Sequence, residues 1–443
     1  MHTAAASPVD RSRGIFDGVT RYHWLVVILA SCGWLFDCMD QRLFILGREP
    51  ALKELLKHDP QAVAAVKTYI GYATTAMILG WATGGILFGV MSDKMGRVKT
   101  MVATLVVYSG FTGLGGLAQG WVDFTVYRFL VGLGVGGMFG AATALVAESV
   151  PSNFRAVALG ILQALSAVGN FMGSLISLQI PPGAASFIGD YSGWRILFFV
   201  GILPALLIAP IVWLLKEPES WLKARADAAS GIANRAVGSP VELFRDVRWR
   251  RNTVVGLFLG VSGMIGLWGI GFFSPELIST ALQGAPQDEI DRVRGWGTAL
   301  QDVGSFFGMI TFTAVASLLS RRLAFFFALT LSMVVTMYVF NSLQTAADAY
   351  WMLPMMGFAQ LAVFAGYSIY FPELFPTRLR GTGVGFCYNT VRYLSAPTPI
   401  LLGYLATVMS FRSAAILLST AYLIGLVALI WAPETKGKPL PEG

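Results

Sequence analysis

The chain has few charged residues and almost none of the side chains that bind metals. Only 13% of its 443 residues are charged, whereas a soluble domain has roughly 25%. Its three histidines lack ligand spacing, so we expect no metal site and no cofactor. The cysteines, Cys32, Cys38 and Cys387, are odd in number and lie in apolar runs, which predicts no disulfide framework.

Several sequence signals are also absent. The chain has no Walker A string, which excludes direct use of ATP. It also has no cluster of catalytic residue types, so we do not expect the protein to be an enzyme. The net charge of +7 is spread over short loops and not over one face, so we expect no nucleic-acid partner. The polar first 22 residues lack the features of a signal peptide, so the first apolar segment is expected to remain in the protein.

Long apolar runs are what the sequence has instead. Hydrophobic residues make up 55% of the chain, and the mean hydropathy is +0.64. Each helix that spans a bilayer needs about 20 apolar residues. The sequence therefore predicts an all-α membrane protein with twelve transmembrane helices. The predicted spans are 23–46, 68–91, 100–118, 122–147, 156–180, 194–215, 253–280, 296–319, 323–343, 349–371, 382–406 and 411–432.

The basic residues indicate the orientation of these spans. Of 32 lysines and arginines, 21 fall on the side of the N-terminus and eight on the other side. The positive-inside rule then places both termini in the cytoplasm, with the chain in the cell (inner) membrane. The hydrophilic stretch after the sixth span is expected to separate two domains. We divide the chain into a tail (1–22), a six-helix bundle (23–215), a linker (216–252), a second bundle (253–432) and a tail (433–443).

Two short motifs recur at matching places in the two halves. The pattern E-x-x-P-x-x-x-R begins at Glu148 and again at Glu373, and a P-E-[ST] string begins at Pro218 and again at Pro433. Recurrence at the same topological position indicates duplication. We therefore expect two pseudo-symmetric six-helix bundles with a binding site between them near the membrane midplane.

The loop after the second span carries a further motif. The segment Gly89–Lys99 reads GVMSDKMGRVK and resembles the signature G-x-x-x-D-[RK]-x-G-[RK] of the major facilitator superfamily. With the recurring motifs, the likeness covers nearly the whole chain and is similar to the branch of sugar porters and of aromatic-acid and metabolite proton symporters. The resemblance implies a monomeric secondary transporter that moves a small organic solute with protons by alternating access.

Two segments bear on the substrate. Within the seventh span, the segment Val261–Trp268 lacks the glutamines and asparagine by which sugar porters of this branch hold hydroxyl groups. The segment Phe36–Asp40 resembles the D-G-x-D element of carboxylate symporters, with Cys38 in place of glycine. An aromatic or other organic anion is therefore favoured over a sugar, and sugar–proton symport is the alternative. Uniport and antiport stay open, and a membrane receptor that does not transport is a further possibility.

Three charged residues inside the spans are candidates for proton coupling. Asp37 and Asp40 share one face of the first span, and burying carboxylates there costs several kcal/mol unless they are compensated. Arg128 of the fourth span lies at a depth similar to that of Asp40, so an ion pair is possible. The resemblance agrees, because symporters of this branch pair a first-helix aspartate with a fourth-helix arginine. The alternative is a permanent structural pair.

Arg392 lies near the middle of the eleventh span, close to Asn389. An arginine at this depth can bind a substrate carboxylate through two hydrogen bonds. The alternative is a structural partner such as Asp302. Further residues that we expect to line the cavity are Gln163, Asn170, Gln301, Gln360, Trp268 and Tyr367, although aromatic residues in membrane proteins more often serve packing.

The loop charges suggest a gating network on the cytoplasmic side. Asp93, Arg97, Glu148 and Arg155 resemble the family's network that holds the two halves together while the site faces outward. A counterpart in the second half would use Glu373, Arg380 and Arg322. The alternative is that such charges only set the topology, and we prefer it for Lys94 and Lys99.

Overall fold

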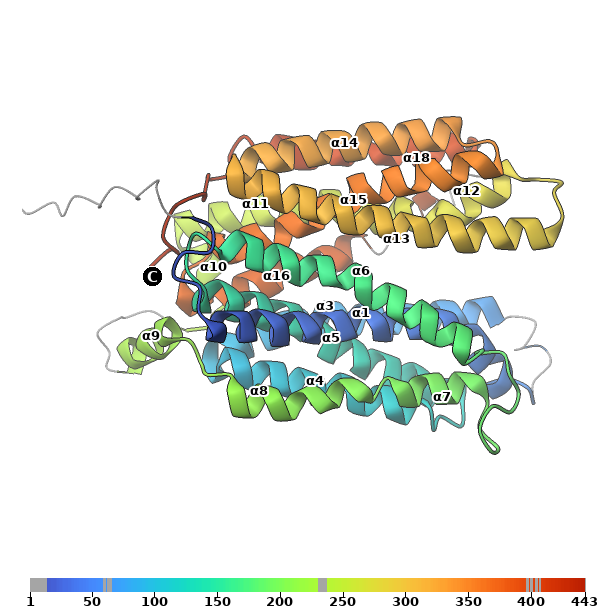
Figure 1. Cartoon of the computed structure of the whole chain (residues 1–443), viewed down its shortest axis with the longest axis horizontal. Coiled ribbons are helices and arrows are strands. Elements are labelled where there is room, and N and C mark those ends of the chain that lie inside the picture. Colours follow the sequence, from blue (N-terminus) through green and yellow to red (C-terminus); the bar gives the residue numbers. More distant parts are fainter. Residues whose placement is uncertain are drawn as a thin grey trace, which may run out of the picture.

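The computed structural model describes residues 14–58, 61, 66–229, 237–395, 398, 401–402, 405 and 408–442. Residues 1–13 of the predicted first tail, 230–236 of the predicted linker, parts of the predicted span 382–406 and Gly443 lie outside this set. The helices form two bundles that lie side by side, with the blue-to-green first half below the yellow-to-red second half (Figure 1).

The first half contains six membrane segments. Five are single helices, and the sixth is broken near Gly201 and Pro204, where two helices are joined by a 3-10 turn. Proline has no N–H to donate, so it interrupts the α-helical hydrogen bonds. The elements are α1 (Arg21–Leu55), α3 (Val66–Met95), α4 (Arg97–Gly115), α5 (Trp121–Ser149), α6 (Arg155–Gln179), α7 (Gly193–Val200), η1 (Leu203–Leu207) and α8 (Ile208–Leu214).

Two short helices lie in the described part of the linker, and the second half then follows the same order. Its first membrane segment is interrupted by a π-helical turn, and its fifth begins with a 3-10 turn. The elements are α9 (Glu219–Ala229), α10 (Glu242–Arg245), α11 (Val247–Met264), η2 (Ile265–Ile270), η3 (Gly271–Phe273), α12 (Ser274–Ala281), α13 (Gln287–Leu318), α14 (Arg321–Ser342), α15 (Ala346–Leu374), η4 (Thr377–Leu379), α16 (Arg380–Ser395), α18 (Phe411–Ser419) and α19 (Tyr422–Ala428).

Apolar length explains why these segments are helical. In hydrocarbon a backbone must satisfy its own hydrogen bonds, which a helix does. Within the described residues, 10 helices or helix groups are long and apolar enough to cross a membrane. The other two segments are the interrupted group α11–α12 and α16. The predicted all-α fold of twelve membrane segments in two bundles is confirmed.

Glycines allow the close helix contacts that position the site. A Cβ atom on Gly80 of α3 would lie 2.1 Å from the carbonyl oxygen of Phe129, so α3 and α5 touch through their backbones. Between the halves, a Cβ atom on Gly385 of α16 would lie 2.3 Å from the carbonyl oxygen of Gly85. Small residues at such contacts let helices approach closely. This close contact holds α3 and α16, and so the two halves, against each other.

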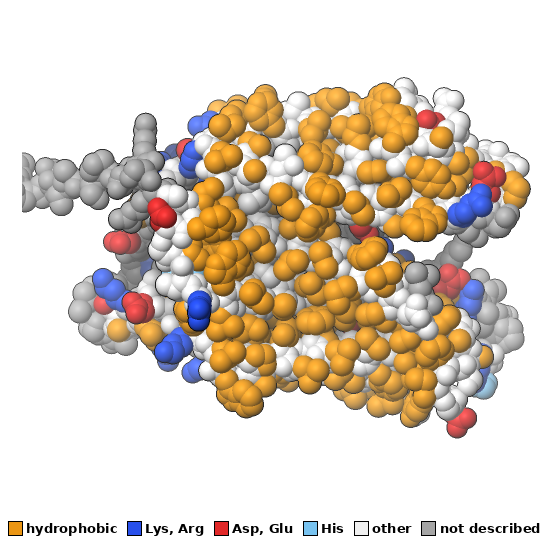
Figure 2. Space-filling model, viewed as in Figure 1, with side chains coloured by type: hydrophobic (Ala, Val, Ile, Leu, Met, Phe, Trp, Pro, Cys, Tyr) orange, Lys and Arg blue, Asp and Glu red, His pale blue; other side chains and the backbone are white. Residues whose placement is uncertain are grey.

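The molecule has two distinct ends. We call the end that carries the start of α1, the helices α9 and α10 and the C-terminal tail the linker end, and the opposite end the open end (Figure 1). Apolar side chains cover most of the visible face, whereas charged side chains gather at the two ends (Figure 2). This distribution suits a bilayer around the middle of both bundles.

Candidate functional site

A cavity of about 410 Å³ lies between the two halves. Helices α1, α3 and α6 line it from the first half, and α13, α15, α16 and the segment η2–α12 line it from the second. A hollow separates the halves at the open end, and charged side chains are visible in it (Figure 2). The charged residues that line the cavity are Arg42, Arg48, Arg392, Asp302 and Glu276.

Arg392 is held on the wall of this cavity by aromatic rings and by its own helix. Its guanidinium carbon lies 3.9 Å from the ring centroid of Trp81 and 4.7 Å from that of Tyr388. Its Nη1 donates to the carbonyl oxygen of Tyr388 at 2.8 Å and to Oδ1 of Asn389 at 2.9 Å. Its Nε has no partner, and no described acid forms an ion pair with it. A cation between aromatic rings is therefore available to an anion.

The acid considered as a partner for Arg392 binds another residue. Asp302 of α13 forms an ion pair with Arg42 of α1, with 2.6 Å between Oδ2 and Nη2. This pair joins the two halves across the cavity. The alternative in which Asp302 neutralises Arg392 is therefore wrong in this conformation.

The other predicted lining residues divide into two groups. Gln163, Asn170 and Gln301 line the cavity, and Oε1 of Gln163 has no hydrogen-bond partner. Gln301 accepts a hydrogen bond from Ser274 at 2.8 Å. The residues that the cavity does not reach are Asn389, Gln360 and Tyr367, and the side chain of Trp268 lies outside the described part of the structure.

Each of the three residues outside the cavity is occupied elsewhere. Asn389 donates to the carbonyl oxygen of Gly385 at 2.9 Å and accepts a hydrogen bond from Arg392. It therefore supports Arg392 without lining the cavity itself. Gln360 donates to Thr336 at 3.0 Å, and Tyr367 donates to the carbonyl oxygen of Leu259 at 2.7 Å. The bonds of Gln360 and Tyr367 tie α15 to α14 and to α11, whereas both partners of Asn389 belong to its own helix, α16. In this conformation the three side chains lie outside the cavity lining, and their part in substrate binding stays a prediction.

The carboxylates of α1 are buried inside the first half and do not face lipid. Asp37 and Asp40 are both 0% exposed, and none of their carboxylate oxygens has a hydrogen-bond partner by distance and angle. Asp40 lies near Thr112 and in the electrostatic field of Arg128. No ion pair joins Asp40 to Arg128 among the described contacts. The expected neighbours have come together, but the expected ion pair has not formed.

Arg128 is enclosed by aromatic rings. Its guanidinium carbon lies 4.7 Å from the ring centroid of Phe198, 5.5 Å from that of Phe44 and 5.6 Å from that of Phe124. Its three guanidinium nitrogens have no hydrogen-bond partner within the described chain. An enclosed, unpaired cation beside an unpaired carboxylate is costly. Water, protonation of Asp40 or an ion pair between the two groups would lower this cost.

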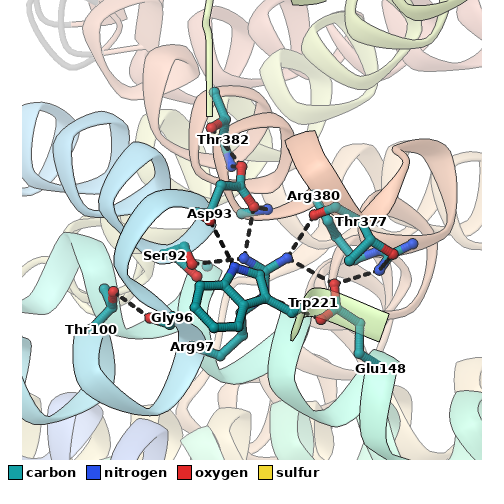
Figure 3. Close-up of polar contacts among 12 residues, drawn as sticks. Ser92, Asp93, Gly96, Arg97, Thr100, Glu148, Trp221, Thr377, Arg380 and Thr382 are labelled. Atoms are coloured by element: carbon teal, nitrogen blue, oxygen red, sulfur yellow. Dashed lines mark hydrogen bonds and ion pairs between the residues drawn. The ribbon is translucent and has the colours of Figure 1, made fainter. Parts of the chain in front are cut away.

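A network at the linker end joins the halves through Asp93 and Arg97 (Figure 3). Arg97 donates to Asp93 at 2.9 Å, to Glu148 at 2.8 Å and to the carbonyl oxygen of Thr377, in the other half, at 2.7 Å. Asp93 accepts from the backbone N–H groups of Gly381 and Thr382 at 2.9 and 2.8 Å. The network closes this end of the molecule because its bonds cross between the halves.

Further members of the network lie at the same end. Glu148 also accepts from Arg380 of the second half, and Arg380 donates to the carbonyl oxygen of Pro372 at 2.9 Å. Arg155 donates to the carbonyl oxygen of Ala147 at 2.9 Å and interacts electrostatically with Glu373. The predicted residues of the first half and Arg380 are thus brought together at the linker end.

The prediction that Arg322 belongs to the second-half network needs a correction. Arg321 makes the ion pair with Glu373, at 3.0 Å between Nη2 and Oε1. Arg322 points elsewhere and donates to the carbonyl oxygen of Leu429 at 3.0 Å. The two arginines are adjacent on α14, so their side chains leave the helix about 100° apart and reach different neighbours.

Sequence reasoning gave no role to several residues that complete this region. Glu217 accepts from the backbone N–H groups of Arg97, Val98 and Lys99, at 2.6 to 3.2 Å, and so caps α4. Trp221 donates to the carbonyl oxygen of Asp93 at 2.7 Å. The P-E-[ST] string was the available signal for both, because it marks the same position after each half.

Comparison with known proteins settles the family. The model of the major facilitator superfamily matches residues 49–398. The chain belongs to the major facilitator superfamily. The fold of such a transporter is also seen in the solved proton:xylose symporter XylE, which has a TM-score of 0.75 and 18% identity and covers 95% of this chain and 98% of its own.

Relatives within the superfamily share more of the sequence. The cis,cis-muconate transport protein of Acinetobacter baylyi is 28% identical and covers 82% of this chain and 84% of its own length. The sialic acid transporter NanX of Escherichia coli is 26% identical, covering 90% of this chain and 92% of its own length. This chain is accordingly a multi-pass membrane transporter of the superfamily and not an enzyme.

Proposed function

We propose that this transporter moves an organic carboxylate, together with protons, across the inner membrane. The observation that carries the proposal is Arg392, a cation without an acidic partner on the wall of the cavity between the halves. A substrate carboxylate at Arg392 would gain charge-assisted hydrogen bonds while Trp81 and Tyr388 provide flat apolar contacts. The related proteins named for muconate and sialic acid transport act on carboxylic acids, which supports the same class.

The proposed orientation places both termini and the linker end in the cytoplasm. Most basic loop residues lie at this end, as the positive-inside rule requires. The open end then faces outward, so the described conformation would accept substrate from outside. The bundles 23–215 and 253–432, joined by the linker 216–252, would move against each other in a monomer to open the linker end.

Proton coupling would use Asp40, Asp37 and Arg128. The proton affinity of a buried carboxylate depends on nearby charge and on access of water. Since Asp40 and Arg128 are neighbours without an ion pair, movement of α5 against α1 changes both conditions. Such a change would load the proton in one conformation and release it in the other.

The first experiment identifies the class of substrate. Thermal shifts of the purified protein are measured with aromatic acids, sugar acids, dicarboxylates and sugars. We expect carboxylic acids to raise the melting temperature. Stabilisation by sugars alone would overturn the carboxylate proposal in favour of sugar–proton symport.

The second experiment tests coupling with the strongest binder as radiolabelled substrate. In proteoliposomes with an acidic exterior, we expect the wild type to accumulate substrate uphill and Asp40→Asn to lose accumulation. Asp40→Asn should keep exchange of labelled for unlabelled substrate, because exchange needs no net proton movement. Asp190→Asn, an exposed loop control, should behave as the wild type does. Uphill uptake by Asp40→Asn would refute the role of Asp40.

A further inference from the structure

The ion pair between Arg42 and Asp302 crosses the cavity itself. Its members come from α1 and α13, in opposite halves, and both line the cavity. Their side chains are 23% and 24% exposed, so cavity water reaches both. The 2.6 Å contact uses one nitrogen of Arg42, and its buried Nε has no partner. The guanidinium therefore still has donors available for a carboxylate.

Arg42 and Arg392 lie near the same residue of the cavity wall, Cys38. The thiol of Cys38 lies within the electrostatic reach of both arginines, and Cys38 also lines the cavity. Cys38 and Arg42 are four residues apart on α1 and so share a helix face. The cavity is lined by Arg42 and Arg48 from the first half and by Arg392 from the second, and of these three only Arg42 forms an ion pair with an acid among the described residues.

We propose that Arg42 is a second carboxylate-binding residue. While the site is empty, the carboxylate of Asp302 occupies the place at Arg42 that a substrate carboxylate would take. This inference rests on the proposed function, because it assumes that Arg392 binds the first carboxylate. A dicarboxylate would bridge the two arginines by replacing Asp302 at Arg42. A monocarboxylate would leave the ion pair in place and bind more weakly.

The exchange at Arg42 replaces one carboxylate with another. The guanidinium keeps a charge-assisted hydrogen bond throughout, and Asp302 passes to the water of the cavity. The substrate thereby competes with an acid of the protein. Removing that acid should strengthen binding of a dicarboxylate, whereas removing Arg42 should weaken it.

The test uses ligands that differ only in the second acidic group. Binding of phthalate, isophthalate and terephthalate to the purified full chain is compared with binding of the corresponding methylbenzoates. The three isomers differ in the distance between their two carboxylates. An isomer whose carboxylates do not match the separation of Arg42 and Arg392 therefore does not decide the test. The variants are Arg42→Gln, Asp302→Asn and Arg48→Gln. Arg48 lines the same cavity but donates to Thr74 at 3.0 Å, so its variant controls for the loss of one positive charge.

We expect at least one dicarboxylate to bind the wild type about tenfold more tightly than its methyl counterpart, as one charged hydrogen bond allows. Arg42→Gln should remove this preference and leave binding of the methylbenzoate unchanged. Asp302→Asn should tighten dicarboxylate binding several-fold, and Arg48→Gln should keep the preference. Asp302→Asn gives a test of opposite sign if Arg42→Gln does not fold.

The outcomes separate this inference from the proposed function. Equal binding of both ligand classes, or an equal loss of both in Arg42→Gln, would overturn the role of Arg42 while the carboxylate transporter stands. Weaker dicarboxylate binding by Asp302→Asn would also overturn it. If no carboxylic acid binds any variant, the proposed function itself fails.

Discussion

At the scale of the residue, the proposed carboxylate site depends on what kind of cation lies at position 392. Arg392 offers a planar guanidinium between two aromatic rings, with Nε still without a partner. Lysine would keep the charge but lose the fork that binds a carboxylate with two hydrogen bonds. We expect Arg392→Lys to raise the Kd of the carboxylate about tenfold and Arg392→Gln about a hundredfold.

The measurement for Arg392 is a binding titration of the purified variants. Arg225→Lys is the matched control, because Arg225 also lies over a tryptophan, 5.2 Å from the ring of Trp221, but belongs to the linker. Its affinity should equal that of the wild type. Unchanged affinity in Arg392→Gln would assign Arg392 a structural role.

The residues also show where sequence reasoning ends. Asp37, Asp40 and Arg128 could be selected because charges inside apolar spans need a reason. Partners could not be assigned in the same way: Asp302 binds Arg42, 260 residues away, and not Arg392. Likewise, Arg321 and Arg322 are chemically identical in the sequence. Only the rotation of α14, fixed by its contacts, decides which one reaches Glu373.

At the scale of the element, two carboxylates hold the ends of helices at the linker end. Glu217 caps α4, and Glu434 accepts from the N–H groups of Arg321 and Arg322 at the start of α14, as well as from Ser320. Free N–H groups and the helix dipole make such an end favourable for negative charge. The acid precedes the proline of its P-E-[ST] string in one half and follows it in the other.

The cap of α14 makes stability depend on pH. Burial favours the neutral form of Glu434, but hydrogen bonds from Ser320 and from the backbone of Lys436, Arg321 and Arg322 outweigh it, so the pKa of Glu434 lies below its usual value. A group with a lowered pKa stabilises the folded state above its unfolded pKa, roughly 4.3. That contribution is lost as the pH falls through the folded pKa.

We therefore expect Glu434→Gln to lower the melting temperature at pH 7, by an amount consistent with a cap of about 1 kcal/mol. The difference from the wild type should shrink steadily below about pH 4. Melting curves in detergent over this range measure it. Glu442→Gln, exposed near the end of the described chain, is the control and should not change the curve. A difference that grows on acidification would contradict the assigned role.

Elements were predictable where the bilayer dictates them. Twelve apolar runs of sufficient length had to become helices, because hydrocarbon leaves the backbone no other partner. Helix ends beyond the apolar runs, and interruptions within a span, were not predictable in this way. Helix α1 continues past its apolar run through Pro50 to Leu55, and η2 interrupts the seventh segment at Ile265–Ile270. These features depend on tertiary contacts, which the hydropathy of the sequence does not indicate.

At the scale of the whole molecule, the linker end is closed by bonds that belong to neither half alone. Asp93 binds Gly381 and Thr382, while Arg97 reaches Thr377 (Figure 3). A transporter must break these bonds to open this end, so their strength sets the balance between conformations. The family resemblance pointed to Asp93 and Arg97, but their backbone partners became visible only once the halves were placed together.

Weakening the linker-end network should therefore shift the whole molecule. Asp93→Asn loses the charge that pairs with Arg97 and weakens the bonds to Gly381 and Thr382, each worth on the order of 1.5 kcal/mol. We expect hydrogen–deuterium exchange at the start of α16 to rise several-fold, while helix ends at the open end become more protected. Lys94→Gln, an exposed neighbour, should exchange as the wild type does. Faster exchange at both ends would indicate loosening of the fold instead of a change of conformation, because alternating access requires one end to close as the other opens.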